Sequence, residues 1–126
     1  MAKIKITVGD ESYDANLDEE TAPETVGAIL DALPIEAPAK AWGEEFYFDI
    51  PVDVGLENEV ETVSVGDLAY WPQGNAFCIF FGKTPMSPSE EEIVPASPVN
   101  PVGTIENAEA LKSHVPGEQV RISPAN

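Results

Sequence analysis

Nucleophilic and metal-ligating side chains are scarce in this sequence. Cys78 is its only cysteine and His114 its only histidine. One cysteine excludes both an intramolecular disulfide and a metal site built from cysteines, and a Ser-His-Asp triad would depend on His114 alone. Cys78 lies in an apolar run without a neighbouring base, which favours a buried core residue, and His114 follows a short helical turn, which favours the surface. We therefore predict no catalytic residue, no metal site and no cofactor.

Two acidic clusters, at residues 44–45 and 90–92, carry carboxylate oxygens that suit a hard cation. Neither cluster lies in the glycine-punctuated loop that is typical of a calcium site. Solvated surface is therefore the better interpretation of both. Glu44 keeps some interest as a pocket carboxylate because Trp42 and Tyr47 are close to it in the sequence.

Short strands are expected to position these residues. Residues 3–8 place apolar side chains at alternate positions, and together with the turn that follows they predict a β-hairpin over residues 3–17. Proline and glycine separate the later apolar runs, which indicates all-β organisation. The further predicted strands cover residues 39–42, 46–50, 60–65, 68–71, 76–81, 102–105 and 119–122.

One helix interrupts this pattern. Thr21 and Glu24 have capping-box spacing, in which each side chain can satisfy a backbone N–H group at the start of a helix. The apolar stripe that follows predicts a helix that ends before Pro34. A short helical turn is expected over residues 107–113, and residues 84–101, which are rich in proline, are expected to form an irregular surface loop.

The length and composition predict one globular domain. The chain has 126 residues, of which 43% are hydrophobic, enough for one packed core but too few residues for two. We therefore expect a single domain over residues 1–126. No apolar run approaches the roughly 20 residues needed to span a bilayer, and the N-terminus lacks a signal-like apolar block, so we expect a cytoplasmic location.

The charge balance is strongly acidic. The chain has 23 Asp and Glu against 6 Lys and Arg, a formal net charge of −17. This excess repels phosphate backbones and anionic membrane surfaces, so neither a nucleic acid nor a membrane is an expected partner. It also strains the compact state by self-repulsion, which salt would screen. We therefore hypothesise a halophilic or salt-accumulating source.

Four runs of the sequence carry a resemblance to a known family. They are residues 42–48 (WGEEFYF), 66–72 (GDLAYWP), 76–85 (AFCIFFGKTP) and 95–103 (PASPVNPVG). Together they resemble the cyclophilin-like proteins of archaea and bacteria, a family largely without an assigned function. The resemblance implies a closed barrel of about eight mostly antiparallel strands capped by two helices.

The resemblance also bears on prolyl isomerase activity. True prolyl isomerases of this fold use an arginine beside an apolar pocket of phenylalanine, tryptophan and histidine. Laid on this sequence, the pocket residues fall at Cys78, near Met86 and near Val99, and none is retained. The only arginine is Arg121, on the last predicted strand, and the cation closest to the expected place of the catalytic arginine is Lys40, which lacks the guanidinium fork.

A groove of the kind in which cyclophilins bind peptides is the expected site. Strand alternation separates Phe77 and Ile79 from Cys78 and Phe80, so that one face fills the barrel and the other faces outward. Packing beneath the loop of residues 84–101 is the alternative explanation for any single groove residue. The candidate ligand-binding residues are Trp42, Glu44, Phe46, Trp71, Cys78, Phe80 and Met86.

The expected function is that of a non-catalytic binding module. Its partner would be a small apolar ligand or an extended peptide, because the aromatic cluster has no acid, base or nucleophile beside it. Two alternatives stay open: a divergent peptidyl-prolyl cis-trans isomerase, and a structural or assembly partner that docks through the loop of residues 84–101.

The charge excess gives a first prediction. We expect the melting temperature to rise between low salt and about 2 M KCl, because the Debye length falls to about 3 Å near 1 M salt and self-repulsion is screened. Calorimetry at a series of KCl concentrations measures this. A melting temperature that does not change with salt would contradict salt adaptation.

Overall fold

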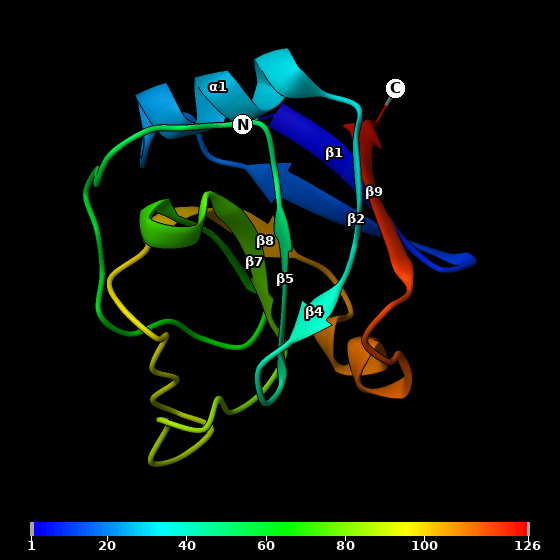
Figure 1. The fold of residues 1–126 in the computed structure, drawn as a ribbon, viewed down its shortest axis with the longest axis vertical. Coiled ribbons are helices and arrows are strands. Elements are labelled where there is room, and N and C mark those ends of the chain that lie inside the picture. Colours follow the sequence, from blue (N-terminus) through cyan, green and yellow to red (C-terminus); the bar gives the residue numbers. More distant parts are fainter. Residues whose placement is uncertain (1, 126) are drawn as a thin grey trace.

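The computed structural model describes residues 2–125 as a mainly β protein with one α-helix (Figure 1). None of the helices in this range is long and apolar enough to cross a membrane. In chain order, the elements are β1 (Ala2–Val8), β2 (Glu11–Leu17), α1 (Pro23–Ala32), β3 (Ile35–Pro38), β4 (Lys40–Ala41), β5 (Glu45–Asp49), β6 (Asp67–Trp71), the 3-10 helix η1 (Pro72–Gly74), β7 (Ala76–Phe80), β8 (Asn100–Ile105), the 3-10 helix η2 (Ala108–Ser113) and β9 (Gln119–Pro124).

The strands form one antiparallel sheet that nearly closes into a barrel. Its strand order is β3-β9-β1-β2-β8-β6-β7-β5-β4, so β3 and β4 lie at its two ends. Only Ala39 separates these two strands in the sequence. β3 pairs with β9, β4 pairs with β5, and the Ala39 N–H donates to Glu118 O at 2.9 Å. One extended segment thus joins both edges, which leaves little unpaired backbone.

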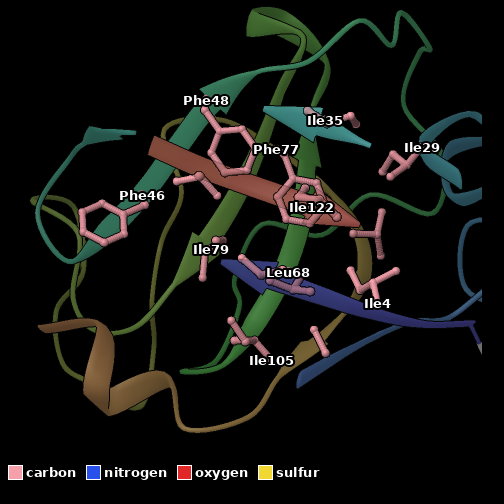
Figure 2. Close-up of a cluster of buried hydrophobic side chains, with 14 of the residues drawn as sticks. Ile4, Ile29, Ile35, Phe46, Phe48, Leu68, Phe77, Ile79, Ile105 and Ile122 are labelled. Carbon is pink, nitrogen blue, oxygen red and sulfur yellow. The ribbon is translucent and has the colours of Figure 1, made fainter. Parts of the chain in front are cut away.

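The barrel interior is filled by the alternate residues of its strands (Figure 2). Phe48 and Phe77 stack there with their ring centroids 5.5 Å apart. Val26 and Ile29 of α1 are fully buried in the same cluster, so the helix packs against the barrel. Each strand therefore has an inner and an outer set of side chains.

Both predicted hairpins are confirmed. β1 and β2 pair over their whole length, and β6 and β7 pair around η1 with Leu68 opposite Ile79. Asn75 closes the second turn with a φ of 48°, in the left-handed region that asparagine tolerates. The predicted helix and the helical turn near residue 110 are confirmed as α1 and η2.

The predicted strand at residues 60–65 is wrong. This segment makes only two isolated bridges, from Val60 to Val99 and from Val63 to Ile93. The stretch from Val60 to Val63 is shorter than the stretch from Ile93 to Val99 that faces it, and the longer stretch contains Pro95. A continuous ladder is therefore impossible, because the register does not match and proline has no N–H to donate.

The predicted capping box is also wrong. The N-cap residue of α1 is Ala22, without a side-chain cap, and the Thr21 hydroxyl donates instead to Asp18 at 2.8 Å. The cap comes from a distant loop. Glu57 accepts hydrogen bonds from the Glu24 N–H at 3.1 Å and the Thr25 N–H at 2.9 Å, which places a negative charge at the positive end of the helix.

A buried asparagine connects this cap to the barrel. Asn100 is fully buried at the start of β8. Its side-chain oxygen accepts from the Glu57 N–H at 2.8 Å, and its Nδ2 donates to the Thr25 hydroxyl at 3.1 Å and to Gly55 O at 2.9 Å. The network joins the helix, the loop of residues 50–66 and the strand that follows the loop of residues 84–99.

The Glu57 cap gives a second prediction. The Thr25 hydroxyl also donates to Glu57, at 2.7 Å. Glu57→Ala therefore removes the acceptor for two helix N–H groups and this hydroxyl, so we expect a loss of about 1–2 kcal/mol in the free energy of unfolding. Urea denaturation measures the loss. Glu59→Ala, an exposed glutamate in the same loop, is the control, and an equal effect of both substitutions would contradict the role of Glu57.

Candidate functional site

A second apolar cluster lies on the outer face of the barrel. β6 and β7 place Ala69 and Cys78 opposite each other on this face, away from the interior side chains. Ile93 and Val99, from the loop of residues 84–99, cover them together with Val63. We call this set, which also contains Phe80, the outer cluster. The outer face of β6 and β7, which would otherwise contact water, is therefore buried beneath the loop.

The loop that covers the outer cluster is held by its own side-chain hydrogen bonds. The Thr84 hydroxyl donates to Val94 O. Ser87 Oγ accepts from the Thr84 N–H and the Val94 N–H, each at 3.0 Å. These contacts close the segment on itself and set the position of Pro95, the next residue along the chain.

Beside the outer cluster, between the loop and β5, is a pocket of about 180 Å³. Its surface is mainly aromatic and aliphatic. The lining residues are Trp42, Glu45, Tyr47, Trp71, Cys78, Pro95, Ala96 and Val99. They come from the β4–β5 turn, three strands and the loop, so the pocket depends on the register of the sheet.

Glu45 is the acidic residue of this pocket. It is 6% exposed, and the side-chain group that interacts with it is the Cys78 thiol. Burial raises the pKa of Glu45 to about 7, and the thiol contact offsets only part of this effect. Burial also raises the pKa of the Cys78 thiol, and the Glu45 charge adds to this rise, so Cys78 is a neutral thiol rather than a thiolate nucleophile.

The aromatic walls are held in fixed positions. The rings of Tyr47 and Trp71 meet edge to face with centroids 6.3 Å apart. The Trp71 indole N–H donates to the Ser97 hydroxyl, which ties the ring to the loop. Gly74 lies so close to the ring that an added Cβ would be 2.6 Å from Trp71 Cε3. The indole is therefore confined by Gly74 and held through its nitrogen.

The residues predicted as ligand-binding fall into two groups. Trp42, Trp71 and Cys78 line the pocket. The others do not: Phe46 packs against Phe81 in the barrel interior with centroids 4.7 Å apart, and Phe80 is buried in the outer cluster.

Glu44 and Met86 also lie outside the pocket lining. Glu44 accepts from the Lys83 N–H at 3.3 Å and pairs with Lys112 at 3.9 Å. Lys112 also pairs with Glu90 at 3.7 Å, so this contact tethers η2 to the loop. Met86 is 55% exposed.

Five of the lining residues are not among those predicted from the sequence. The pairing of β5 with β7 places Tyr47 opposite Cys78 and Phe46 opposite Ile79. The sequence left open which face of β7 points outward. Because Cys78 lies in the outer cluster, this register places Tyr47 and Glu45 outward and Phe46 inward. The missed residues are Glu45, Tyr47, Pro95, Ala96 and Val99.

His114 belongs to a separate polar cluster, and the residue is half-buried rather than fully on the surface. Its side chain is 7% exposed. One ring nitrogen lies 2.9 Å from the Tyr13 hydroxyl and 3.0 Å from Glu11, and the other lies 3.0 Å from Glu118. Glu118 in turn accepts from the Val115 N–H at 2.7 Å. Contacts on both nitrogens hold the end of η2 against β2, which is a structural role.

Two alternatives to this pocket have less support. A hollow of about 650 Å³ lies over the outer face of β1 and β2, where Lys5 pairs with Asp14 at 3.9 Å, and its lining contains no buried polar side chain. Residues 2–125 contain no group of three His, Cys, Asp or Glu side chains arranged to hold a metal ion. The aromatic pocket with Glu45 is therefore the strongest candidate.

Comparisons with known proteins agree with this architecture. A sequence model of the family described as Cyclophilin-like matches residues 2–123. The chain is similar to a hypothetical protein of Archaeoglobus fulgidus whose solution structure is known, with 45% identity and a TM-score of 0.83 over 98% of this chain and 95% of that one. A search of the curated proteins gave no match.

The buried carboxyl gives a third prediction. Glu45 has an ordinary pKa of about 4.3 when unfolded, against about 7 when folded. At a pH between these two pKa values, Glu45 has lost its proton in the unfolded state but still carries it in the folded state. The free energy of unfolding of the wild type therefore falls with rising pH, relative to that of Glu45→Gln, by at most about 3 kcal/mol. Urea denaturation of both proteins across this range measures the difference.

The control for this prediction is Glu61→Gln, which removes an exposed carboxyl. An equally large pH-dependent difference between this variant and the wild type would show that the effect does not come from Glu45. A pH-independent difference between the wild type and Glu45→Gln would contradict the raised pKa.

Proposed function

The chain belongs to the cyclophilin-like family, and on this premise we propose that it is a binding protein that takes a small, mainly apolar ligand in the pocket between Trp42 and Trp71. The observation that carries the proposal is a pocket that faces outward from a filled barrel and is lined by three aromatic side chains and one buried carboxyl. Ligand sites of soluble proteins have this composition of apolar walls with a few polar groups.

The size of the pocket supports a small ligand. Its volume of about 180 Å³ is below the roughly 300–1,000 Å³ of pockets that enclose drug-sized molecules, and an apolar cavity of about 150 Å³ is large enough to bind benzene. One ring with a short substituent therefore fits. An extended peptide would contribute at most one side chain.

The place of the pocket in the fold supports the same proposal. Two positions onto which the resemblance puts the isomerase pocket, Cys78 and Val99, line it. The chemistry at these positions has changed to a thiol and an aliphatic side chain. Arg121 lies on β9, where it pairs with Glu36 at 3.0 Å, and it does not line the pocket. These observations favour binding over prolyl isomerisation.

The fourth prediction uses both tryptophans as reporters. Trp42 and Trp71 are the only two in the chain, and both line the pocket. We expect neutral benzyl alcohol to shift the NMR signals of both indole N–H groups in a saturable way. Ala96→Phe, which extends a ring from an exposed wall position, should weaken this binding about tenfold or more, equal to about 1.4 kcal/mol.

The matched control is Ala110→Phe, at an exposed alanine of η2 that does not line the pocket. It should bind benzyl alcohol as the wild type does. Indole signals that do not move, or an equal loss in both variants, would contradict the proposed function. Peptide shifts with catalysed exchange of a prolyl bond would instead support the isomerase alternative.

A further inference from the structure

The Glu45 carboxyl has no counter-ion within the described residues. Residues 2–125 contain no ion pair between Glu45 and a lysine, arginine or histidine, whereas the neighbouring Glu44 pairs with Lys112 at 3.9 Å. Its side-chain partner is the Cys78 thiol, a weak donor. A carboxylate that is 6% exposed is costly to ionise unless a positive charge compensates it. The pocket wall therefore presents an acceptor whose natural complement is a cation.

The aromatic residues around Glu45 suit a cation of a particular kind. The faces of tryptophan and tyrosine rings attract ammonium groups through their quadrupoles, within about 6 Å of the ring centroid. Tyr47 already takes part in such a contact, because Lys40 Nζ lies 5.9 Å from its centroid. Trp42 and Trp71 line the same pocket. Aromatic rings combined with one buried carboxyl favour an organic ammonium group over a strongly hydrated metal ion.

The net charge of the chain also favours a cationic ligand. The chain carries a net charge of −17, and no lysine, arginine or histidine is among the pocket-lining residues. Such a field raises the local concentration of cations and repels anions. A carboxylate or phosphate ligand would meet no compensating group in this pocket, so anionic ligands are disfavoured.

We propose that the ligand of this pocket is a small organic monocation, a primary or methylated amine with a short apolar body, whose ammonium group pairs with Glu45 and lies against the rings of Trp42, Tyr47 and Trp71. This inference rests on the proposed function and adds the chemical class of the ligand. The ammonium group supplies the positive charge that Glu45 lacks, and the apolar body contacts Pro95, Ala96 and Val99.

Three probes with the same ring and different charges test the inference. They are benzylammonium, benzyl alcohol and benzoate, titrated against the protein and followed through the NMR signals of the two indole N–H groups. We expect benzylammonium to bind about tenfold or more tightly than benzyl alcohol, and benzoate to bind most weakly. The titrations are run at low salt and at about 1 M NaCl, where the Debye length is about 3 Å and attraction by the distant surface is screened.

Two glutamates that are adjacent in the sequence give a matched pair of variants. Glu45→Gln keeps the shape of the side chain and removes its charge, so the affinity for benzylammonium should fall to that for benzyl alcohol in the same variant. Glu44→Gln removes the same charge outside the pocket lining and should keep the preference for the cation.

The outcomes separate the two proposals. Equal binding of benzylammonium and benzyl alcohol to the wild type would overturn the inference and leave the proposed function standing. A preference that disappears at about 1 M NaCl, or that Glu44→Gln reduces as much as Glu45→Gln does, would also overturn it, because the general surface field or an alkali cation would then be responsible. If none of the probes moves the indole signals, the proposed function fails as well.

Discussion

Closure of the barrel through the segment of β3, Ala39 and β4 determines how the other strands place their side chains. Because this segment pairs with β9 at one end and with β5 at the other, each strand must divide its side chains between a filled interior and an outer face. On most strands the outer residues are polar. On β7 they are Cys78 and Phe80, which cannot be left in water, so the loop of residues 84–99 covers them.

The pocket is a consequence of this covering. The loop seals the outer cluster with Ile93 and Val99, and next to it the aromatic residues of β5 and β6 meet Pro95 and Ala96 around the remaining space. Glu45 lies in the same pocket because its side chain, like that of Tyr47, is on the outer face of β5. A carboxyl buried there at a free-energy cost, without an ion pair, is difficult to explain by stability alone, since paired or apolar substitutes would be more stable. Recognition of a cation explains it.

The sequence predicted most of the strands, because two-residue periodicity and turn chemistry are local signals, and the resemblance predicted the barrel. The sequence pattern missed β3 and wrongly predicted a strand at residues 60–65. The acidic and aromatic residue types of the site were also recognised. The particular residues were only partly predicted, since the phase of β5 relative to β7 is set by pairing between strands that are distant in the sequence. For the same reason Glu44 was preferred to Glu45. The Glu57 cap of α1 was missed because its donors and acceptor are far apart in the chain.

Cation binding in this pocket requires that Glu45 is a buried carboxyl without a counter-ion among aromatic side chains. A ¹³C NMR titration of the Glu45 carboxyl carbon measures the protonation of that group itself. We expect a pKa of about 7, which falls when benzylammonium is bound. A pKa near the ordinary value of about 4.3, unchanged by the cation, would contradict it.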